Sequence, residues 1–270
     1  MESIIYMDIK LSIVIVEYHC IDEIMQCVES LKTHIKIPYE IIISSNSCYN
    51  DQQRKTIHTT DSNVHWLFNK RNDGFAYAMN EGLKVAHGDY LVIMNSDCIL
   101  ESELDKMIDF MDNHPEVGAI APQMRDSNGN IQDTARPYVS VPRYIWRQIK
   151  RITGHKSSIL DSSIDYTRVQ TVDWLIGAFI MVSRKAYETT HGLDNQFFMY
   201  AEDLDWCTRI RQQGFEVVYY PKCVINYKGT RRARNNPKYA IIFIRSHIIY
   251  WRKFSFFYGY PKRKNIHFLD

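Results

Sequence analysis

The sequence has few cysteines, and their spacing suits neither a metal site nor a disulfide framework. No two of the six are separated by two residues, the spacing that zinc sites commonly use. Scattered cysteines of this kind are typical of proteins from a reducing compartment. They stand at Cys20, Cys27, Cys48, Cys98, Cys207 and Cys223.

Long apolar runs are also missing. No run approaches the length of about 20 residues that a transmembrane helix requires. The first ten residues include Glu2 and Asp8 and lack the apolar stretch of a signal peptide. Apolar residues nevertheless make up 45% of the chain, as in a globular protein. We therefore expect a cytoplasmic protein.

Acidic side chains are absent from most of the C-terminal fifth. Between Glu216 and Asp270 there is no Asp or Glu, yet this stretch holds 12 of the 33 Lys and Arg residues. The first 216 residues carry 21 basic and 30 acidic side chains, so an acidic body precedes a basic tail. Such asymmetry indicates a surface that meets anionic lipid or nucleic acid. The chain lacks any nucleic-acid-binding motif, so no nucleic-acid partner is expected.

The tail itself, residues 236–270, predicts a helix. Asn236-Pro237 is a suitable start, because proline fits the first helical position. Four apolar residues then recur at helical spacing and three basic residues share another face: Ile241, Ile244, Ile248 and Trp251; Lys238, Arg245 and Arg252. Two interpretations remain open. The apolar stripe packs on the body, or it lies in the interface of an anionic membrane at the inner face of the cell.

Aromatic residues and a second basic cluster follow this predicted helix. The aromatic residues are Phe254, Phe256, Phe257, Tyr258 and Tyr260, and Lys262-Arg263-Lys264 comes after them. Aromatic and basic side chains together favour the membrane interpretation.

The body of the chain alternates between predicted strands and helices. Near-continuous apolar runs predict strands over residues 11–18, 40–44, 63–68, 90–94 and 117–124, another within 172–182, and one over 216–220. Apolar residues at helical spacing predict helices over residues 22–32, 75–86, 101–113 and 201–213. This order is typical of an α/β protein with a mostly parallel sheet covered on both faces. Residues 134–170 show no clear period and predict a long excursion over the surface.

Polar residues stand directly after the predicted strands, where such sheets bind ligands. They are Tyr18, Ser45-Asn46-Ser47 and Asn95-Ser96-Asp97. The last triplet suits either a divalent cation or the cap of a following helix. Asn72, Gly74 and Phe75 precede the helix predicted over residues 75–86. Gly74 there allows a phosphate to approach the helix N-terminus, or simply forms a turn.

A second polar cluster, Glu202-Asp203-Leu204-Asp205, opens the helix predicted over residues 201–213. Carboxylates are stabilised at a helix N-terminus, so the cluster has a structural explanation. It can also supply a general base whose pKa its neighbours adjust. The aromatic run Phe197–Tyr200 precedes it. We expect some of these rings to pack in the core and others to stack on a sugar.

Six segments together resemble the family-two glycosyltransferases of the GT-A fold, and most of all a rhamnosyltransferase-like branch that builds bacterial surface polysaccharides. The segments are LSIVIVEYHC, EIIISSNSC, NDGFAYAMNEGL, GDYLVIMNSDC, WLIGAFIMVSRKAY and FFMYAEDLDWCTRIRQQGFEVVYYP. The resemblance implies a Rossmann-like GT-A domain over residues 1–235, followed by the helical tail at 236–270. It also implies a role for each matching residue.

The implied donor-binding residues are Tyr18, Ser45, Asn46, Asn72, Gly74, Phe75, Asn80, Asn95 and Asp97. The implied acceptor-binding residues are Trp174, Gly177, Phe198 and Glu202. Asp203 is the implied general base, and Asp97 with Asn226 the implied ligands of Mg²⁺ or Mn²⁺. The implied reaction transfers a sugar, for example rhamnose, from a nucleotide-diphosphate donor to a glycan or lipid-linked acceptor. A single base attacking opposite the leaving group implies inversion.

The sequence departs from the family pattern at three positions. Ser45 replaces an Asp that contacts the nucleoside, Asn95 leaves one acid in the metal motif, and Asn226 replaces a His of the metal site. These departures motivate one alternative, a catalytically impaired protein that binds glycan or nucleotide. A second alternative, a sugar-phosphate nucleotidyltransferase, lacks the Gly-rich phosphate loop that it would need after the first strand.

Overall fold

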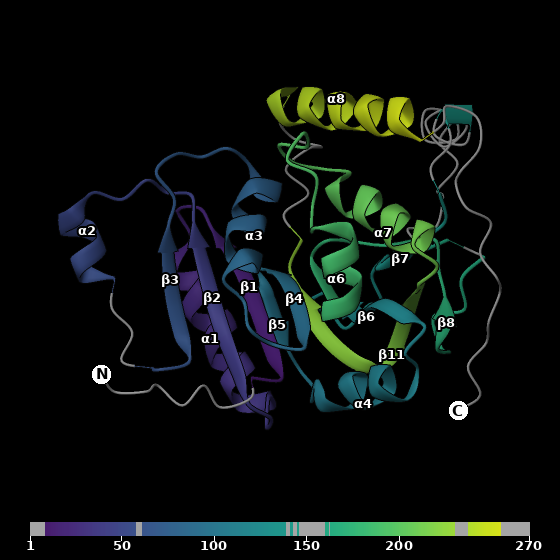
Figure 1. The fold of residues 1–270 in the computed structure, drawn as a ribbon, viewed down its shortest axis with the longest axis horizontal. Helices are drawn as coiled ribbons and strands as arrows, with labels where there is room; N and C mark the ends of the chain where they lie inside the picture. The colour runs from purple at the N-terminus through teal and green to yellow at the C-terminus, as the bar shows by residue number, and fades with distance from the viewer. Residues whose placement is uncertain are drawn as a thin grey trace.

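The computed structural model describes residues 9–57, 61–138, 141–142, 145, 160–161, 163–229 and 237–254. They form an α/β fold around one large mixed sheet (Figure 1), in which the strand order is β3-β2-β1-β4-β10-β6-β11-β5 and β8 pairs with β11. The strands are β1 (Leu11–Glu17), β2 (Tyr39–Ser45), β3 (Val64–Phe68), β4 (Tyr90–Asn95), β5 (Cys98–Leu100), β6 (Val117–Arg125), β7 (Ala135–Arg136), β8 (Gln170–Thr171), β9 (Trp174–Leu175), β10 (Phe179–Ser183) and β11 (Glu216–Tyr227). The helices are α1 (Ile21–His34), α2 (Asp51–Thr56), α3 (Phe75–Lys84), α4 (Asp105–Asn113), α6 (Arg184–Thr190), α7 (Glu202–Gln212) and α8 (Pro237–Lys253).

The first four strands are parallel and end at one edge of the sheet. β1 pairs with β2 and with β4, so that Glu17 lies opposite Ser45 and Val16 opposite Asn95. β-Branched and apolar side chains dominate these strands because both of their faces are covered. The predicted parallel sheet is therefore confirmed for these strands, and their polar ends lie at one edge.

The other half of the sheet is mixed rather than parallel. β10 is antiparallel to both β4 and β6, while β6 and β11 are parallel to each other. β11 continues seven residues beyond the predicted strand end, through a register shift between Tyr220 and Val224. The predicted helix over 101–113 begins only at Asp105, because Cys98–Leu100 pairs with β11 as β5.

Helices cover both faces of this sheet, as the sequence predicts. α1 and α4 bury their apolar sides in one hydrophobic cluster, which includes Ile13 and Ile15 of β1. α3, α6 and α7 contribute to a second cluster on the opposite face, which includes Val14. Successive residues of a strand point to opposite faces, so β1 feeds both clusters.

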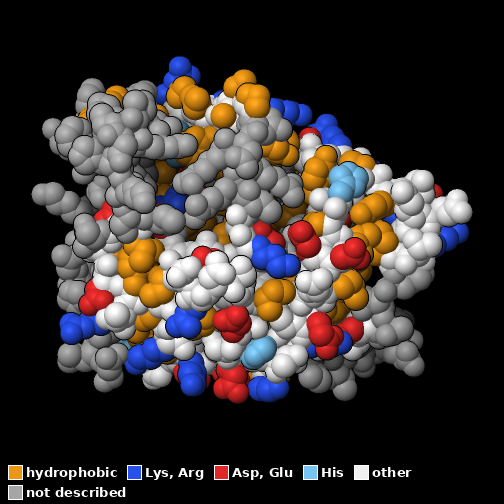
Figure 2. Space-filling view, turned by 180° about the vertical axis from the view of Figure 1, so that it is seen from behind, with side chains coloured by type: hydrophobic (Ala, Val, Ile, Leu, Met, Phe, Trp, Pro, Cys, Tyr) orange, Lys and Arg blue, Asp and Glu red, His pale blue; other side chains and the backbone are white. Residues whose placement is uncertain are grey.

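The tail helix, α8, lies across α7 at the top of Figure 1. Tyr250 and Trp251 join the same hydrophobic cluster as α7, while Ile241, Ile244 and Ile248 are exposed. The predicted stripe that joined Trp251 to the three isoleucines is therefore wrong, because α8 docks through a different side. Orange apolar and blue basic side chains line this upper edge in the space-filling view (Figure 2). Residues 255–270, with most of the predicted aromatic cluster and Lys262-Arg263-Lys264, lie outside the described residues.

Within the described part of the chain, no helix combines the length and the apolar character that crossing a bilayer requires.

Candidate functional site

A buried carboxylate organises the ends of β1 and β2. Glu17 is fully buried, and its Oε2 accepts a hydrogen bond from the Ser45 hydroxyl at 2.5 Å. Its Oε1 accepts from the Ser47 hydroxyl at 3.0 Å, the Tyr49 hydroxyl at 3.1 Å and the Cys20 backbone N–H at 3.1 Å. Four donors satisfy the buried carboxylate. Glu17 therefore holds the loop after β1 and the loop after β2 together.

Asparagine side chains connect the next loop to the same edge. The Asn46 amide nitrogen donates to the Asn72 side-chain oxygen at 3.2 Å and to the Gly74 carbonyl at 3.0 Å. The Asn46 side-chain oxygen accepts from Asn69 at 3.0 Å. The predicted donor-side residues Asn46, Asn72 and Gly74 therefore lie together, and Ser45 is next to them in β2. Tyr18, also at this edge, has an exposed side chain.

Gly74 is required by a close protein contact. Its φ is +104°, and a Cβ built on it would lie 2.3 Å from the Phe198 carbonyl oxygen. The Phe75 backbone N–H donates to that same carbonyl at 2.7 Å. Phe198 therefore occupies the space on the Cβ side of Gly74, and the approach of a phosphate to this helix N-terminus stays a prediction. The contact joins the donor-side loop to the segment before α7.

Asn80 of α3 is bonded to the loop that follows α6. Its amide nitrogen donates to the Leu193 carbonyl and to the Asn195 side chain, both at 2.7 Å, and its oxygen accepts from the Leu193 N–H at 2.9 Å. All of these partners belong to the loop after α6. Asn80 thus links α3 to that loop. Its predicted contact with the nucleotide-sugar donor stays a prediction.

Asn95 is the last residue of β4, and Asp97 follows it in the turn before β5, near Tyr227 of β11. The Asn95 side chain lies close enough to the Tyr227 phenol to lower its pKa. Burial raises the pKa of Tyr227, and the negative charges of Asp97 and Asp203 raise it further. Asp97, the predicted metal ligand, and Asp203, the predicted base, therefore both lie near enough to the Tyr227 phenol for their charges to act on it.

The protein offers a sparse set of metal ligands. Among the described residues, no group of three or more His, Cys, Asp or Glu side chains could enclose a metal ion. Asn226 directs its amide nitrogen to the Glu101 carboxylate at 3.3 Å and the Asp126 carbonyl at 3.5 Å. Its role as a ligand remains a prediction. One carboxylate, Asp97, suits Mg²⁺ or Mn²⁺ that takes its other ligands from phosphate and water.

Asp203 lies at the start of α7 with its carboxylate held by two backbone amides. Its Oδ2 accepts from the Gly177 N–H at 2.8 Å, and its Oδ1 accepts from the Leu204 N–H at 2.7 Å. Burial raises the pKa of Asp203, while these two N–H donors and the Arg136 charge lower it. A Cβ on Gly177 would lie 3.2 Å from the Asp203 Cβ, so a larger residue there would press on Asp203.

The other two carboxylates of the cluster differ sharply from Asp203. Burial, followed by the charge of Asp203, raises the pKa of Glu202 well above its usual range. The buried Glu202 Oε2 has no hydrogen-bond partner among the described residues. Asp205 is fully buried but ion-paired, to Arg209 at 2.7 Å and to Lys253 at 2.6 Å. Of the adjacent carboxyls Asp203 and Glu202, the charged form is therefore favoured more at Asp203, which accepts two backbone N–H bonds, than at Glu202.

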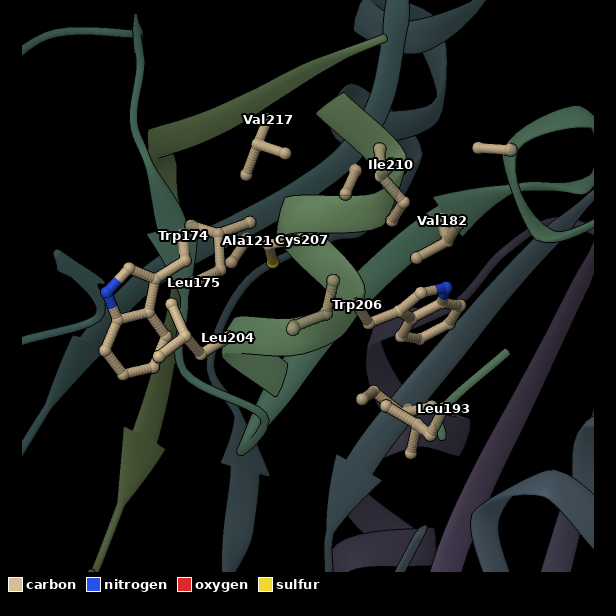
Figure 3. Packing of buried hydrophobic residues seen from close by; sticks show 14 of the residues in the cluster. Ala121, Trp174, Leu175, Val182, Leu193, Leu204, Trp206, Cys207, Ile210 and Val217 are labelled. Atoms are coloured by element: carbon tan, nitrogen blue, oxygen red, sulfur yellow. The ribbon is translucent and has the colours of Figure 1, made fainter. Parts of the chain in front are cut away.

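Hydrophobic packing fixes the position of α7. Figure 3 shows Leu204 and Trp206 on this helix, with Trp174 and Leu175 to one side and Val182 and Leu193 to the other. The chain enters α7 through Tyr200 and Ala201, whose φ angles are +72° and +63°. Consecutive left-handed residues other than glycine are strained, and such strain is concentrated at functional sites.

The predicted acceptor residues surround this helix start. Trp174 is buried and donates from its indole nitrogen to the Pro137 carbonyl at 3.1 Å. Phe198 is 40% exposed, whereas the adjacent Phe197 is fully buried. The expectation that the aromatic run divides between core and surface is thereby confirmed, and the sugar contact of Phe198 stays a prediction.

Three residues of this site escape sequence reasoning. Glu17 carries a signal, since it is a lone acid at the end of an otherwise nearly apolar strand. Tyr227 stands beyond the predicted end of its strand. Arg136 lies within the segment predicted as an excursion, yet its guanidinium is 5.1 Å from the Trp174 ring centroid and lowers the pKa of Asp203.

Comparisons with curated proteins identify similar sequences. An N-acetylglucosaminyl-diphospho-decaprenol L-rhamnosyltransferase of Mycobacterium tuberculosis is 27% identical over 157 residues, covering 54% of this chain and 50% of the relative. The rhamnosyltransferase WbbL of Escherichia coli is 27% identical over 160 residues, covering 58% of this chain and 59% of the relative. The alignments thus span only half to three-fifths of these relatives.

Solved structures support the fold. GalNAc-T7 with UDP, GalNAc and Mn²⁺ gives a TM-score of 0.62 at 16% identity, over 81% of this chain and 44% of that one. The mannosyltransferase PcManGT of Pyrobaculum calidifontis with GDP-Man and Mn²⁺ gives 0.55 at 15% identity, over 84% and 59%. These similarities show the GT-A fold. The family model for glycosyl transferase family 2 matches residues 12–208, from β1 into α7. The chain therefore belongs to glycosyl transferase family 2, with rhamnosyltransferases among its relatives.

Proposed function

We propose that this chain transfers a sugar from a nucleotide-diphosphate donor to a glycan or lipid-linked saccharide, with inversion at the anomeric carbon. The observation that carries the proposal is the Asp203 carboxylate, held by the Gly177 and Leu204 N–H groups at the start of α7. Similarity to an N-acetylglucosaminyl-diphospho-decaprenol L-rhamnosyltransferase and to the rhamnosyltransferase WbbL supports this reaction class, and rhamnose is the first sugar to test.

Asp203 would act as the general base. A sugar hydroxyl is a poor nucleophile, and a positioned base accelerates its attack by about 10²–10⁴-fold. The two backbone donors would favour the ionised form of Asp203 despite burial, while Glu202, whose pKa burial raises well above its usual range, would be the carboxyl that holds a proton. The proton from the acceptor hydroxyl would pass to Asp203 as the new glycosidic bond forms and the bond to the diphosphate breaks.

The strand-end loops would bind the donor. Glu17 holds the loop of Ser45 and Ser47, and Asn46 holds the loop of Asn72 and Gly74. Asp97 would contribute one oxygen to Mg²⁺ or Mn²⁺, which as a Lewis acid would neutralise charge on the departing diphosphate. Asn95 and Tyr227 would fix the position of that strand end.

The first experiment is a screen of UDP, dTDP and GDP sugars for released nucleoside diphosphate, with and without a lipid-linked saccharide. Release that depends on the acceptor and disappears in Asp203→Asn would support transfer. Donor binding by calorimetry without any release would favour the alternative, a binding protein of the same fold. In that case the departures at Ser45 and Asn226 would mark a lost activity.

A further inference from the structure

α8 presents two chemically different sides. Its inner side is built into the body. The Ser246 hydroxyl donates to the Met199 carbonyl at 2.8 Å, and the Tyr250 hydroxyl lies 3.0 Å from the Thr208 hydroxyl. Trp251 packs in the cluster beneath. The outer side carries isoleucines with exposed fractions of 68% at Ile241, 53% at Ile244 and 37% at Ile248.

These isoleucines form one strip along the helix. They are spaced by three and four residues, so their side chains lie above one another on a single face. Large exposed apolar residues elsewhere in the described chain are isolated ones, such as Met25 and Val85. Three isoleucines in a row on one helix face are instead typical of a binding surface.

Basic side chains border this strip. Arg245 and Arg252 are seven residues apart, which puts them on the same edge of the isoleucine strip, and both are exposed. Neither arginine has an ion-pair partner within the described part of the chain. By contrast, Lys253 is ion-paired to Asp194 and Asp205. α8 contains no acidic residue, so its outer side is apolar and positively charged throughout.

We propose that the outer side of α8, formed by Ile241, Ile244, Ile248, Arg245 and Arg252, docks the protein on an anionic lipid bilayer. An apolar strip bordered by arginines matches the boundary between acyl chains and anionic headgroups. α8 would lie in the plane of the surface, since no described helix is able to span a bilayer. A second copy of this chain fits the same face less well, because Arg245 and Arg252 of the two copies would be brought close together and would repel each other.

The position of α8 gives this docking a consequence for the site. Ser246 of α8 bonds to the Met199 carbonyl, four residues before Asp203, and Tyr250 of α8 bonds to Thr208 of α7, so α8 lies beside the helix that carries the predicted base. A bilayer on the outer side of α8 would therefore lie one helix away from α7. If the proposed function holds, a lipid-linked acceptor would reach Asp203 from that membrane surface.

Deletion of the tail is a poor test, because removing α8 would also remove Tyr250 and Trp251 from the core. Point variants avoid this problem. The test is co-sedimentation, without donor, with phosphatidylcholine vesicles that contain or lack phosphatidylglycerol, at low and high salt. One variant combines Ile241→Ser, Ile244→Ser and Ile248→Ser, and another combines Arg245→Gln and Arg252→Gln. Matched controls at distant exposed positions are Met25→Ser with Val85→Ser, and Lys55→Gln with Lys106→Gln.

The unaltered protein should bind only the anionic vesicles and should dissociate at high salt. Each α8 variant should lower the vesicle partition coefficient by about tenfold or more, while both control variants bind as the unaltered protein does. Thermal unfolding should stay unchanged, because the altered side chains are exposed. The proposal is overturned if the unaltered protein ignores anionic vesicles at low salt, or if the α8 variants bind as well as the controls. Loss of a dimer by the isoleucine variant, with vesicle binding intact, would assign the face to self-association instead.

Discussion

At the scale of single residues, Asp203 and Glu202 are adjacent carboxylates with different expected roles. Asp203→Asn should lower the transfer rate by about 10²–10⁴-fold, because the amide cannot accept the acceptor proton. Donor affinity should stay the same, since Asp203 lies on the acceptor side of the reaction. The measurement is steady-state transfer together with donor titration by calorimetry.

Glu202→Gln is the matched control for that variant. The amide resembles the protonated form that Glu202 is expected to hold, so most of the activity should remain. The rate should rise with pH as Asp203 ionises, above the usual Asp range because burial raises its pKa, and Glu202→Gln should keep this rise. A Glu202→Gln protein that is as inactive as Asp203→Asn would move the base to Glu202.

Glu17 offers a second residue-scale prediction, on the donor side. Glu17→Ala would leave the Ser45, Ser47 and Tyr49 hydroxyls without their shared acceptor and would open a void between the two loops. Donor KM should therefore rise by tenfold or more, with a smaller change in kcat. Glu17→Gln should restore most of the loss, because serine and tyrosine hydroxyls can also accept hydrogen bonds. Kinetics with varied donor at saturating acceptor distinguish this outcome from a general loss of fold, which would lower kcat alike in both variants.

At the scale of elements, Lys253 of α8 forms an ion pair with Asp205 of α7. Lys253 bonds to Asp194 at 2.7 Å and to Asp205 at 2.6 Å, and Asp205 is fully buried. Lys253→Met should destabilise the protein by about 1.5–3 kcal/mol, since a buried carboxylate loses a charged donor but keeps Arg209. Arg252→Gln, one residue earlier and exposed, should change stability by less than about 0.5 kcal/mol. Urea unfolding of both proteins provides the comparison, and equal effects would refute the role of Lys253.

Some elements are readable from the sequence and others are not. β1, β2 and β4 are apolar runs bounded by polar residues, so a fully buried strand is the natural interpretation. β5 has only three residues, and α2 has no buried residue, so neither contains a detectable period. α8 has apolar residues on two sides, and periodicity alone could not tell which side would face the body.

The site follows the same pattern. Asn46, Asn72, Asp97 and Asp203 adjoin strands or helices whose ends the sequence defines, and their loops are found together. Arg136 and Tyr227 depend on the path of the chain after β6 and on the register of β11, which are tertiary features. Asn80 is the opposite case. It matches a family motif that implies donor binding, but its side chain is hydrogen-bonded to Leu193 in the loop after α6.

At the scale of the whole molecule, metal and donor are expected to bind together. The described residues provide Asp97 but no group of three metal-ligating side chains, so the diphosphate has to provide further oxygens. Calorimetry should detect little Mn²⁺ binding to the protein alone and clear binding after nucleoside diphosphate is added. Asp97→Asn should weaken the second signal while leaving thermal stability unchanged. Tight Mn²⁺ binding without nucleotide, or full activity in excess chelator, would contradict this expectation.

The docking of α8 on α7 also affects how the chain folds during synthesis. Because a ribosome releases its product from the N-terminus, β1 to β4 can pair once residue 95 has emerged, long before α8 exists. Until Lys253 has left the ribosome, Asp205 lacks one of its two cations, and the cluster around Trp206 lacks Tyr250 and Trp251. An interrupted translation product would thus contain an assembled donor-side edge beside an exposed, incompletely packed base helix, the kind of surface that chaperones recognise.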